Sequence, residues 1–145
     1  MIQIKKGLDL PLAGAPRMEI EDGAPVTRVA VLGNDYLGMK PSLMVEEGDT
    51  VQLGQALFCD KKQTRILYTS PASGKVMAIN RGERRVFLSL VIELAGSDEV
   101  RFAATEDTHL DSLSVEDVEQ RLLESGLWTA LRTRPYSKIP TPGSR

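Results

Sequence analysis

Few residues in this chain have side chains that could carry out catalysis. Cys59 is the only cysteine and His109 the only histidine among 145 residues. One thiol cannot form an internal disulfide, and neither side chain alone provides the ligand set of a metal site. His109 lies in the polar segment TEDTHLDS, which is typical of a surface loop. The 20 acidic residues show no spacing that indicates a paired acid and base. The sequence therefore predicts no catalytic site and no metal site in this chain.

Two adjacent lysines, Lys61 and Lys62, lie in a polar turn that runs from Cys59 to Arg65. A lysine on an exposed turn could carry a covalently attached group. However, clustered charges on loops usually face solvent without a further role, and the turn lacks the Met-Lys-Met pattern of biotin carriers. We therefore favour a solvated basic loop and keep a modified lysine as the alternative.

A second candidate is the loop from Gly33 to Pro41, with the sequence GNDYLGMKP. Its glycines bracket an Asn-Asp pair and one tyrosine, Tyr36, which gives the backbone freedom to turn. Loops on rigid scaffolds often carry binding groups, so this loop could contact a ligand. The alternative is a hairpin connection in which Tyr36 packs over the end of the neighbouring strands. The residue types alone favour the packing role.

The composition limits the class of protein. A length of 145 residues suits one domain, or one small domain with an appendage. The net charge of −2 provides no basic excess for nucleic acid. No phosphate-binding glycine motif, apolar run of membrane-spanning length or signal peptide is visible. Together with the single cysteine, these features predict a cytoplasmic chain without a nucleotide or flavin site.

The stretch from Pro41 to Leu94 contains the elements that position these residues. Its first half, Leu43 to Leu57, predicts a strand, a turn at Gly48-Asp49, a second turn at Gly54 and another strand. Its second half, Ile66 to Ile79, predicts a strand, a Ser-Pro-Ala-Ser-Gly turn and a strand. Two such halves indicate a flattened barrel with internal pseudo-symmetry. The pattern VxxGDxVxxGQxL followed by SPxSGxV resembles the biotinyl/lipoyl family of barrel-sandwich hybrid domains.

Further strands are predicted before this stretch, at its end and after it. Ala24 to Gly33 and Val86 to Leu94 are rich in β-branched and apolar residues, and a charged turn from Arg81 to Arg85 precedes the second run. Short strands are also predicted at Ile2 to Ile4 and at Val100 to Phe102. The predicted core consists of Leu43, Val45, Val51, Leu57, Val76, Ile79, Val91 and Ile92.

From Ser112 the apolar spacing becomes helical. Ser114 and Asp117 predict a capping box, Gly126 predicts the helix end, and Trp128 is expected to anchor a following helical turn. One helical face is predicted from Val115, Val118, Leu122 and Leu123. The predicted fold class is mainly β (α+β), a barrel-sandwich hybrid with a C-terminal helical appendage. Residues 1–104 form the barrel with an N-terminal arm, 105–133 the helical segment and 134–145 an extended tail.

Several segments together are more specific than the barrel pattern. They are IKKGLDLPLAGAP, GNDYLGMKP, GQALFCDKK, SPASGKVMAINRGERR and LRTRPYSKIP. In combination they resemble NqrA, the A subunit of the bacterial Na⁺-translocating NADH:quinone oxidoreductases, over nearly the whole chain. Members of that family are longer, so the chain is expected to be their N-terminal portion. A weaker similarity connects it to the C subunit of the Rnf complex, which shares the barrel and carries Fe–S cysteines elsewhere.

The resemblance implies an accessory subunit domain that is peripheral to the cytoplasmic face of the bacterial inner membrane. It would be a scaffold that docks on the other subunits of a complex that oxidises NADH, reduces ubiquinone and exports Na⁺. Flavins and Fe–S centres are expected in those partner subunits and no cofactor in this chain, with ubiquinone as a substrate near it. The alternatives are a carrier with lipoyl or biotin on Lys61 or Lys62, and an adaptor domain like the Rnf C subunit.

The resemblance also associates the NqrA family with the quinone-reducing end of the complex. A quinone needs an apolar wall and hydrogen-bond donors for its two carbonyl oxygens. Apolar side chains and loop amides of Gly33 to Pro41 could provide both, and the tail from Arg134 to Lys138 could provide a second set of donors. The expected quinone-proximal residues are Leu32, Asp35, Tyr36, Leu37, Met39, Lys40, Tyr136 and Lys138.

Overall fold

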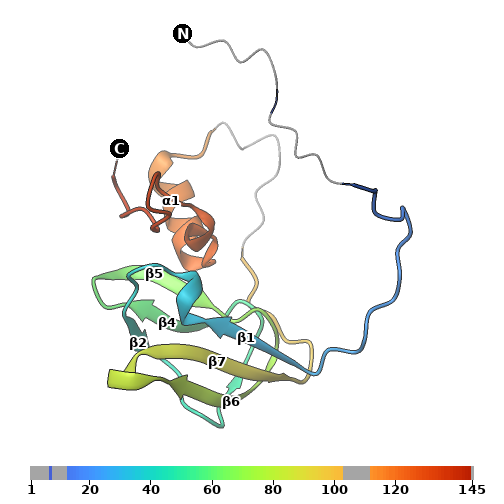
Figure 1. The fold of residues 1–145 in the computed structure, drawn as a ribbon. Helices are drawn as coiled ribbons and strands as arrows, with labels where there is room; N and C mark the ends of the chain where they lie inside the picture. The colour runs from blue at the N-terminus through green and yellow to red at the C-terminus, as the bar shows by residue number, and fades with distance from the viewer. Residues whose placement is uncertain (1–6, 8–12, 103–111, 145) are drawn as a thin grey trace.

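The computed structural model describes residue 7 and residues 13–102 and 112–144, and these form two antiparallel sheets followed by a helix (Figure 1). The order of the first sheet is β1-β7-β6-β3, and the order of the second is β2-β4-β5. The elements are β1 (Arg28–Leu32), η1 (Gly33–Asp35), β2 (Pro41–Leu43), β3 (Thr50–Val51), β4 (Ala56–Asp60), β5 (Gln63–Thr69), β6 (Gly74–Arg81), η2 (Glu83–Arg85), β7 (Phe87–Leu94), α1 (Val115–Glu124) and η4 (Leu127–Ala130). The strand expected at Ile2 to Ile4, and His109, lie outside the described residues.

The predicted turns form where the glycines indicated them. Gly48 adopts a φ of +98°, and the Asp49 carboxylate accepts a hydrogen bond of 2.8 Å from the Glu46 backbone amide. The charged turn from Arg81 to Arg85 joins β6 to β7 as a hairpin. The charged turn keeps β6 and β7 in the first sheet, whereas the turn at Gly48 lies between β2 of the second sheet and β3 of the first.

Four connections between consecutive strands of the described chain cross from one sheet to the other, namely β1–β2, β2–β3, β3–β4 and β5–β6. β1 pairs with β7 in the first sheet, whereas β2 pairs with β4 in the second. The loop from Gly33 to Pro41 is therefore not the hairpin that the sequence left as an alternative, because the strands on its two sides are not paired. The turn between β5 and β6 crosses in the same way. The Ser70 hydroxyl stabilises this turn by donating a hydrogen bond of 2.6 Å to the Ala72 carbonyl oxygen.

The core lies between the two sheets and contains more aromatic residues than predicted. Phe58, Tyr68 and Phe87 are all buried within it. Leu43 and Ile79 of the predicted core pack against it and are only partly buried. The complete buried cluster is Val31, Val45, Val51, Leu57, Phe58, Ile66, Tyr68, Val76, Phe87, Leu90, Ile92 and Leu123. Five of the eight predicted core residues thus belong to it, which are Val45, Val51, Leu57, Val76 and Ile92.

Two predictions for this part of the chain are wrong. Val91 is half-buried, because alternation along β7 points Leu90 and Ile92 into the core and Val91 to the other face. The strand expected at Val100 to Phe102 does not form. Only an isolated bridge joins Glu99 to Leu53 there, since β3 offers too short an edge for a ladder.

The C-terminal helix begins at the predicted capping box. The Asp117 amide donates to the Ser114 hydroxyl at 3.0 Å, and the Ser114 amide donates back to the Asp117 carboxylate at 3.2 Å. Hydrogen bonds from the Ser114 side chain and backbone lower the pKa of Asp117. Leu123 is buried against the barrel, whereas Val115 and Val118 remain exposed. Only the C-terminal end of the predicted apolar face therefore packs.

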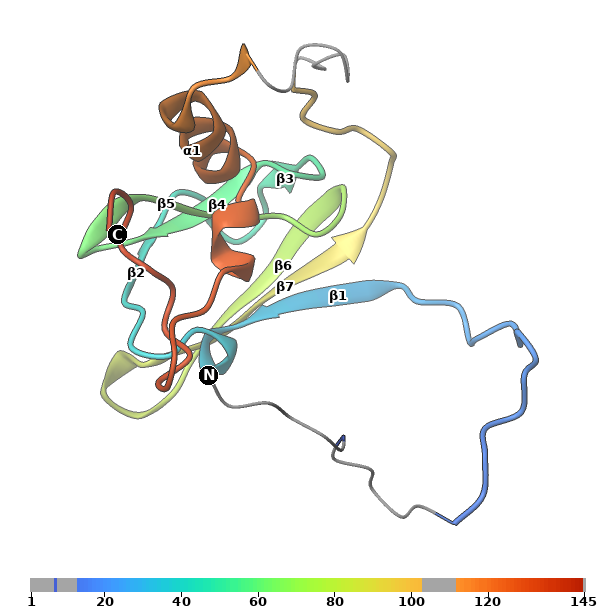
Figure 2. The same cartoon turned by 90° about the horizontal axis from the view of Figure 1, so that it is seen from above.

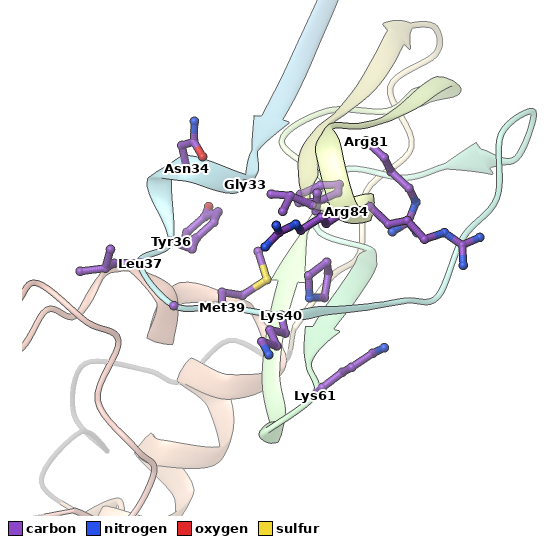
Figure 3. A pocket seen from close by; sticks show the side chains of 14 residues that line it. Gly33, Asn34, Tyr36, Leu37, Met39, Lys40, Lys61, Arg81 and Arg84 are labelled. Atoms are coloured by element: carbon purple, nitrogen blue, oxygen red, sulfur yellow. The ribbon is translucent and has the colours of Figure 1, made fainter.

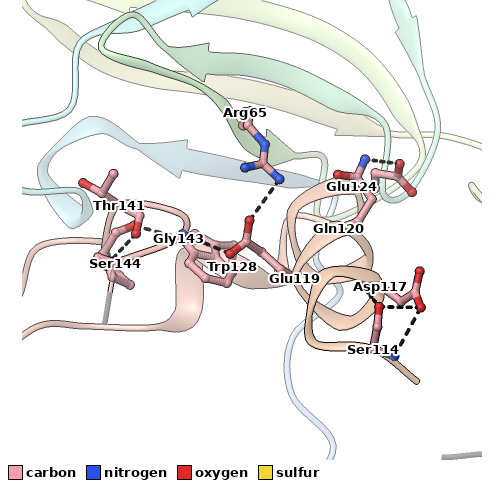
Figure 4. Close-up of polar contacts among 11 residues, drawn as sticks. Arg65, Ser114, Asp117, Glu119, Gln120, Glu124, Trp128, Thr141, Gly143 and Ser144 are labelled. Atoms are coloured by element: carbon pink, nitrogen blue, oxygen red, sulfur yellow. Dashed lines mark hydrogen bonds and ion pairs between the residues drawn. The ribbon is translucent and has the colours of Figure 1, made fainter. Parts of the chain in front are cut away.

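The segment after α1 folds back over the second sheet, where η4 contacts β5 (Figure 2). Glu119 is central to this contact. Its carboxylate forms an ion pair with Arg65 of β5 at 3.0 Å and accepts a hydrogen bond of 2.9 Å from the Gly143 amide (Figure 4). The Trp128 indole donates a hydrogen bond of 2.9 Å to the Pro140 carbonyl oxygen, so the predicted anchoring role of this tryptophan is confirmed.

Candidate functional site

The loop from Gly33 to Pro41 is held at both ends. Gly33 packs so closely on β7 that a Cβ atom there would lie 2.2 Å from the Phe87 carbonyl oxygen. At the other end, the Lys61 amide donates a hydrogen bond of 2.8 Å to the Lys40 carbonyl oxygen. The first sheet and the β4–β5 hairpin therefore fix the position of the loop between them.

Tyr36 begins a row of aromatic rings that leads from this loop into the core. Its ring meets the Tyr68 ring edge-on, with 4.7 Å between the centroids. Tyr68 stacks on Phe58 at 4.7 Å, and Phe58 meets Phe87 edge-on at 5.1 Å. Each pair of this kind contributes about 0.5–1.5 kcal/mol beyond the burial of its surface. Tyr36 thus does pack over the end of the barrel, and this packing fixes the direction of its hydroxyl.

The surroundings keep both phenols in the neutral form. Burial raises the pKa of Tyr68, and the nearby Asp60 carboxylate raises it further. Burial also raises the pKa of Tyr36, with a contribution from Asp35, while Arg132 opposes the change. Neither hydroxyl hydrogen-bonds to another residue in the described part of the chain. Both phenols can therefore donate a hydrogen bond to an added acceptor at neutral pH.

Arg132 joins the C-terminal segment to the loop. Its guanidinium carbon lies 5.6 Å from the centroid of the Tyr36 ring, within the range of a cation–π contact. The same guanidinium donates to the carbonyl oxygens of Thr129 and Leu131, which hold it at the end of η4. The ring of Tyr36 therefore lies between the core and an arginine from the far end of the chain.

A hollow of about 230 Å³, here called the smaller hollow, opens where the loop meets the C-terminal segment. Its apolar lining comes from Leu37, Met39, Ile66 and Ile139. Its polar lining includes the phenols of Tyr36 and Tyr68 together with Asp60, Lys62, Gln63, Lys138 and Thr141. Apolar side chains and two tyrosines with neutral phenols thus line the same space.

A second hollow of about 830 Å³, here called the larger hollow, shares the loop as one wall (Figure 3). Its other wall is the start of β7 and the turn between β6 and β7. Met39, Pro41, Val86 and Phe87 supply apolar surface. The charged side chains around it are all basic, namely Lys40, Lys61, Arg81, Arg84 and Arg85.

The structure brings together part of the predicted quinone-proximal set. Tyr36, Leu37 and Met39 line both hollows, Lys40 lines the larger one and Lys138 the smaller one. The remaining members, Leu32, Asp35 and Tyr136, are exposed and line neither hollow. The predicted meeting of the loop with the tail thus occurs at Lys138 rather than at Tyr136.

Several neighbours of Tyr36 were missed by the sequence analysis. Tyr68 carried a usable signal, because it alternates with Ile66 in β5 and period-two spacing places both side chains on one face. Arg132 and Ile139 carried none, since they reach the loop only through the folding back of the C-terminal segment. The basic residues of the turn from Arg81 to Arg85 were recognised as a charged turn but were not connected with the loop.

The basic hairpin predicted around Lys61 and Lys62 is partly as expected. Both lysines are exposed in the tight turn between β4 and β5. Arg65 differs, because it lies in β5 and pairs with Glu119.

Among the described residues, no group of three or more His, Cys, Asp and Glu side chains could hold a metal ion. The search of the same residues found no helix of sufficient length and apolarity to span a bilayer.

The two sheets and their crossing connections define a barrel-sandwich hybrid domain with a C-terminal helix. The family model described as the NqrA N-terminal barrel-sandwich hybrid domain matches residues 2–95. The model described as the NqrA second alpha/beta domain matches residues 113–145. The first match covers more than half of the chain, so the chain belongs to the NqrA family and corresponds to its N-terminal portion, as the sequence motifs predicted. The predicted division of the chain into residues 1–104, 105–133 and 134–145 stays a prediction.

Curated relatives agree with this assignment. Each is named as the A subunit of a Na(+)-translocating NADH-quinone reductase. The one from Yersinia pseudotuberculosis serotype O:1b (strain IP 31758) is 59% identical over 145 residues, covering 100% of this chain and 32% of the relative. The one from Hahella chejuensis (strain KCTC 2396) is 61% identical over 140 residues, which cover 97% of this chain and 31% of the relative. The chain therefore spans about a third of the length of the curated relatives it matches.

Proposed function

We propose that this chain serves as a peripheral part of the A subunit in a Na⁺-translocating NADH-quinone reductase. Its family membership and the names of its relatives support this role. In this proposal the barrel is a scaffold that docks on other subunits at the cytoplasmic face of the membrane. Those subunits hold the flavins and Fe–S centres, and this chain holds no cofactor. NADH oxidation, ubiquinone reduction and Na⁺ transport belong to the whole assembly.

We further propose that the smaller hollow receives the head group of the quinone. The observation that carries this proposal is the joint presence of two neutral phenols, Tyr36 and Tyr68, and an apolar lining that includes Met39 and Ile139. The phenols would donate to the quinone carbonyl oxygens, and the apolar side chains would contact the ring. A volume of about 230 Å³ is below the range of roughly 300–1,000 Å³ for whole drug-sized ligands. The hollow therefore suits a head group whose tail extends outside.

The Tyr36 hydroxyl offers a direct test. Tyr36→Phe keeps the ring and its contact with Tyr68 but removes the donor. In the assembled reductase we expect the KM for a short-chain ubiquinone to rise about two- to tenfold, the effect of losing one neutral hydrogen bond. Tyr136→Phe is the matched control, because Tyr136 is 69% exposed and lines neither hollow, and its KM should not change.

An assembled complex whose KM is unchanged by Tyr36→Phe would rule out this quinone contact. If the variant complex fails to assemble while the Tyr136→Phe complex forms, the loop is a docking element and the head group binds elsewhere. Steady-state assays and native gels on the same preparations separate these outcomes.

One observation favours a second candidate function. Lys61 and Lys62 are exposed at the tip of the β4–β5 hairpin, and carrier domains of the biotinyl/lipoyl family present their modified lysine on such a turn. A carrier should gain a defined adduct when it is co-expressed with a lipoyl or biotin ligase. Intact mass spectrometry would detect it, and a mass equal to that of the bare chain would remove this candidate.

A further inference from the structure

The larger hollow is lined by five basic side chains. Lys40 and Lys61 lie along one side and Arg81 and Arg84 along the other (Figure 3), and Arg85 also lines the hollow. Among the described residues, no Asp or Glu lines this hollow, and none of these five side chains forms an ion pair. Like charges held close together repel one another, so their arrangement is unfavourable until an anion joins them.

The backbone at two of these arginines is strained. Arg84 and Arg85 adopt φ values of +53° and +62°, in the left-handed region that residues with a side chain rarely occupy. The neighbouring Gly82, which could adopt such values without cost, has a φ of −92°. Strain of this kind tends to persist at ligand-binding sites, where it helps to position a group. Here it sets two successive guanidinium groups in the turn that forms one wall of the hollow.

The same space also has an apolar side. Met39, Pro41, Phe87 and the exposed Val86 all line it. Its volume of about 830 Å³ falls within the usual range for organic ligands. The guanidinium group matches the geometry of phosphate oxygens, with which it forms paired hydrogen bonds. A ligand that satisfies both sides carries a phosphate group and an apolar part.

We propose that the larger hollow binds the phosphate group of an amphiphilic organic phosphate, with Arg84 and Arg85 as the principal contacts. The phosphate could belong to a phospholipid headgroup or to a soluble molecule, and the chemistry of recognition is the same. Arg81 contributes less, because it also borders Glu46 and Glu47 in a neighbouring hollow. Its principal contacts differ from those of the proposed quinone site, since Arg84 and Arg85 do not line the smaller hollow.

Two probes distinguish the sources of phosphate. Inorganic pyrophosphate, titrated into the 145-residue chain in a calorimeter, tests for a soluble phosphate. Co-sedimentation with phosphatidylcholine vesicles, with and without phosphatidylglycerol, tests for a lipid phosphate. In Arg84→Gln/Arg85→Gln we expect binding of the effective probe to weaken about tenfold or more. Arg17→Gln/Arg101→Gln is the matched control, because it changes the net charge equally at two exposed arginines outside the hollow.

Either probe supports the proposal if its binding weakens in Arg84→Gln/Arg85→Gln and stays unchanged in the control. Binding of pyrophosphate assigns a soluble phosphate, and binding of phosphatidylglycerol vesicles alone assigns a lipid. If the arginine variant does not fold, as judged by thermal unfolding, Lys40→Gln/Lys61→Gln should show the same loss from the opposite side of the hollow. The proposal is wrong if the unmodified chain binds neither probe, or if the control variant loses as much affinity as the site variant.

Discussion

The Tyr68 phenol is buried beside Tyr36 and near the Asp60 carboxylate, and these surroundings raise its pKa above the ordinary value of 10.0. The folded chain therefore keeps a proton that the unfolded chain releases near that pH. The resulting stabilisation is fully present below the unfolded pKa and is lost as the pH rises through the raised pKa. We expect the free energy of unfolding to fall above pH 10 less steeply in Tyr68→Phe than in the unmodified chain.

Urea unfolding at a series of pH values from about 8 to about 11 measures this slope. Tyr136→Phe is the matched control for removing a tyrosine hydroxyl, because that side chain is exposed. Equal slopes in Tyr68→Phe and the unmodified chain would mean that the phenol ionises as easily in the folded state as in the unfolded state. That result would contradict the burial of the Tyr68 phenol that the fold indicates.

Neighbouring residues of β7 should differ in their contribution to stability. Ile92 is fully buried, so Ile92→Ala should reduce the free energy of unfolding by about 2–5 kcal/mol. Val91 is half-buried on the opposite face, and Val91→Ala should cost about 1 kcal/mol or less, below the range expected from a buried valine. Denaturant midpoints of the two variants provide the comparison. Equal losses would indicate that β7 is covered on both faces.

The candidate site was only partly predictable from single residues. Tyr36, Leu37 and Met39, which the sequence indicated as quinone-proximal candidates, line the smaller hollow, and their contact with a quinone stays a prediction. The sequence could not show that Leu32 faces away, because this depends on Val31 taking the inward position at the end of β1. Nor could it show that Tyr136 remains exposed, because the tail contacts the loop through later residues.

At the scale of elements, the junction between α1 and η4 depends on Gly126. This residue has a φ of +77°, and an added Cβ atom would lie 2.5 Å from the Thr69 hydroxyl oxygen of β5. Gly38 provides a matched control, because its φ is +78° and nothing lies within 4 Å of the added atom. Gly38→Ala should cost about 1–2 kcal/mol from the backbone alone.

Gly126→Ala should cost more than Gly38→Ala, because it adds a steric clash to the same backbone strain. The difference between the two variants in free energy of unfolding measures how tightly the C-terminal segment packs on β5. Equal costs would show that the segment can move away from Thr69 without loss, and the smaller hollow would then lack a fixed wall.

Elements with strong local signals were predicted, and elements that depend on distant partners were not. The turn at Gly48-Asp49 and the capping box at Ser114 follow from short-range chemistry, and both form. The strand expected at Val100 to Phe102 has suitable residues but no sheet edge long enough to pair with. The crossing of the loop between sheets was missed because strand pairing, unlike strand formation, leaves no local pattern at Gly33 to Pro41.

At the scale of the whole molecule, the smaller hollow lies between two regions that match different domains of the family. The loop from Gly33 to Pro41 belongs to the match over residues 2–95, and Lys138, Ile139 and Thr141 belong to the match over residues 113–145. The hollow therefore exists only because the second region folds back on the barrel. This arrangement explains why neither segment alone suggests a complete binding site.

Methyl NMR spectroscopy tests the proposed quinone contact most directly, with a short-chain ubiquinone titrated into the methyl-labelled chain. We expect the methyl signals of Met39 and Ile139, which line the smaller hollow, to shift and saturate together. Val86 lines only the larger hollow, and Met18 and Met77 line neither, so their signals should stay in place. Unmoved Met39 and Ile139 signals, or equal movement at all five residues, would contradict a specific quinone contact.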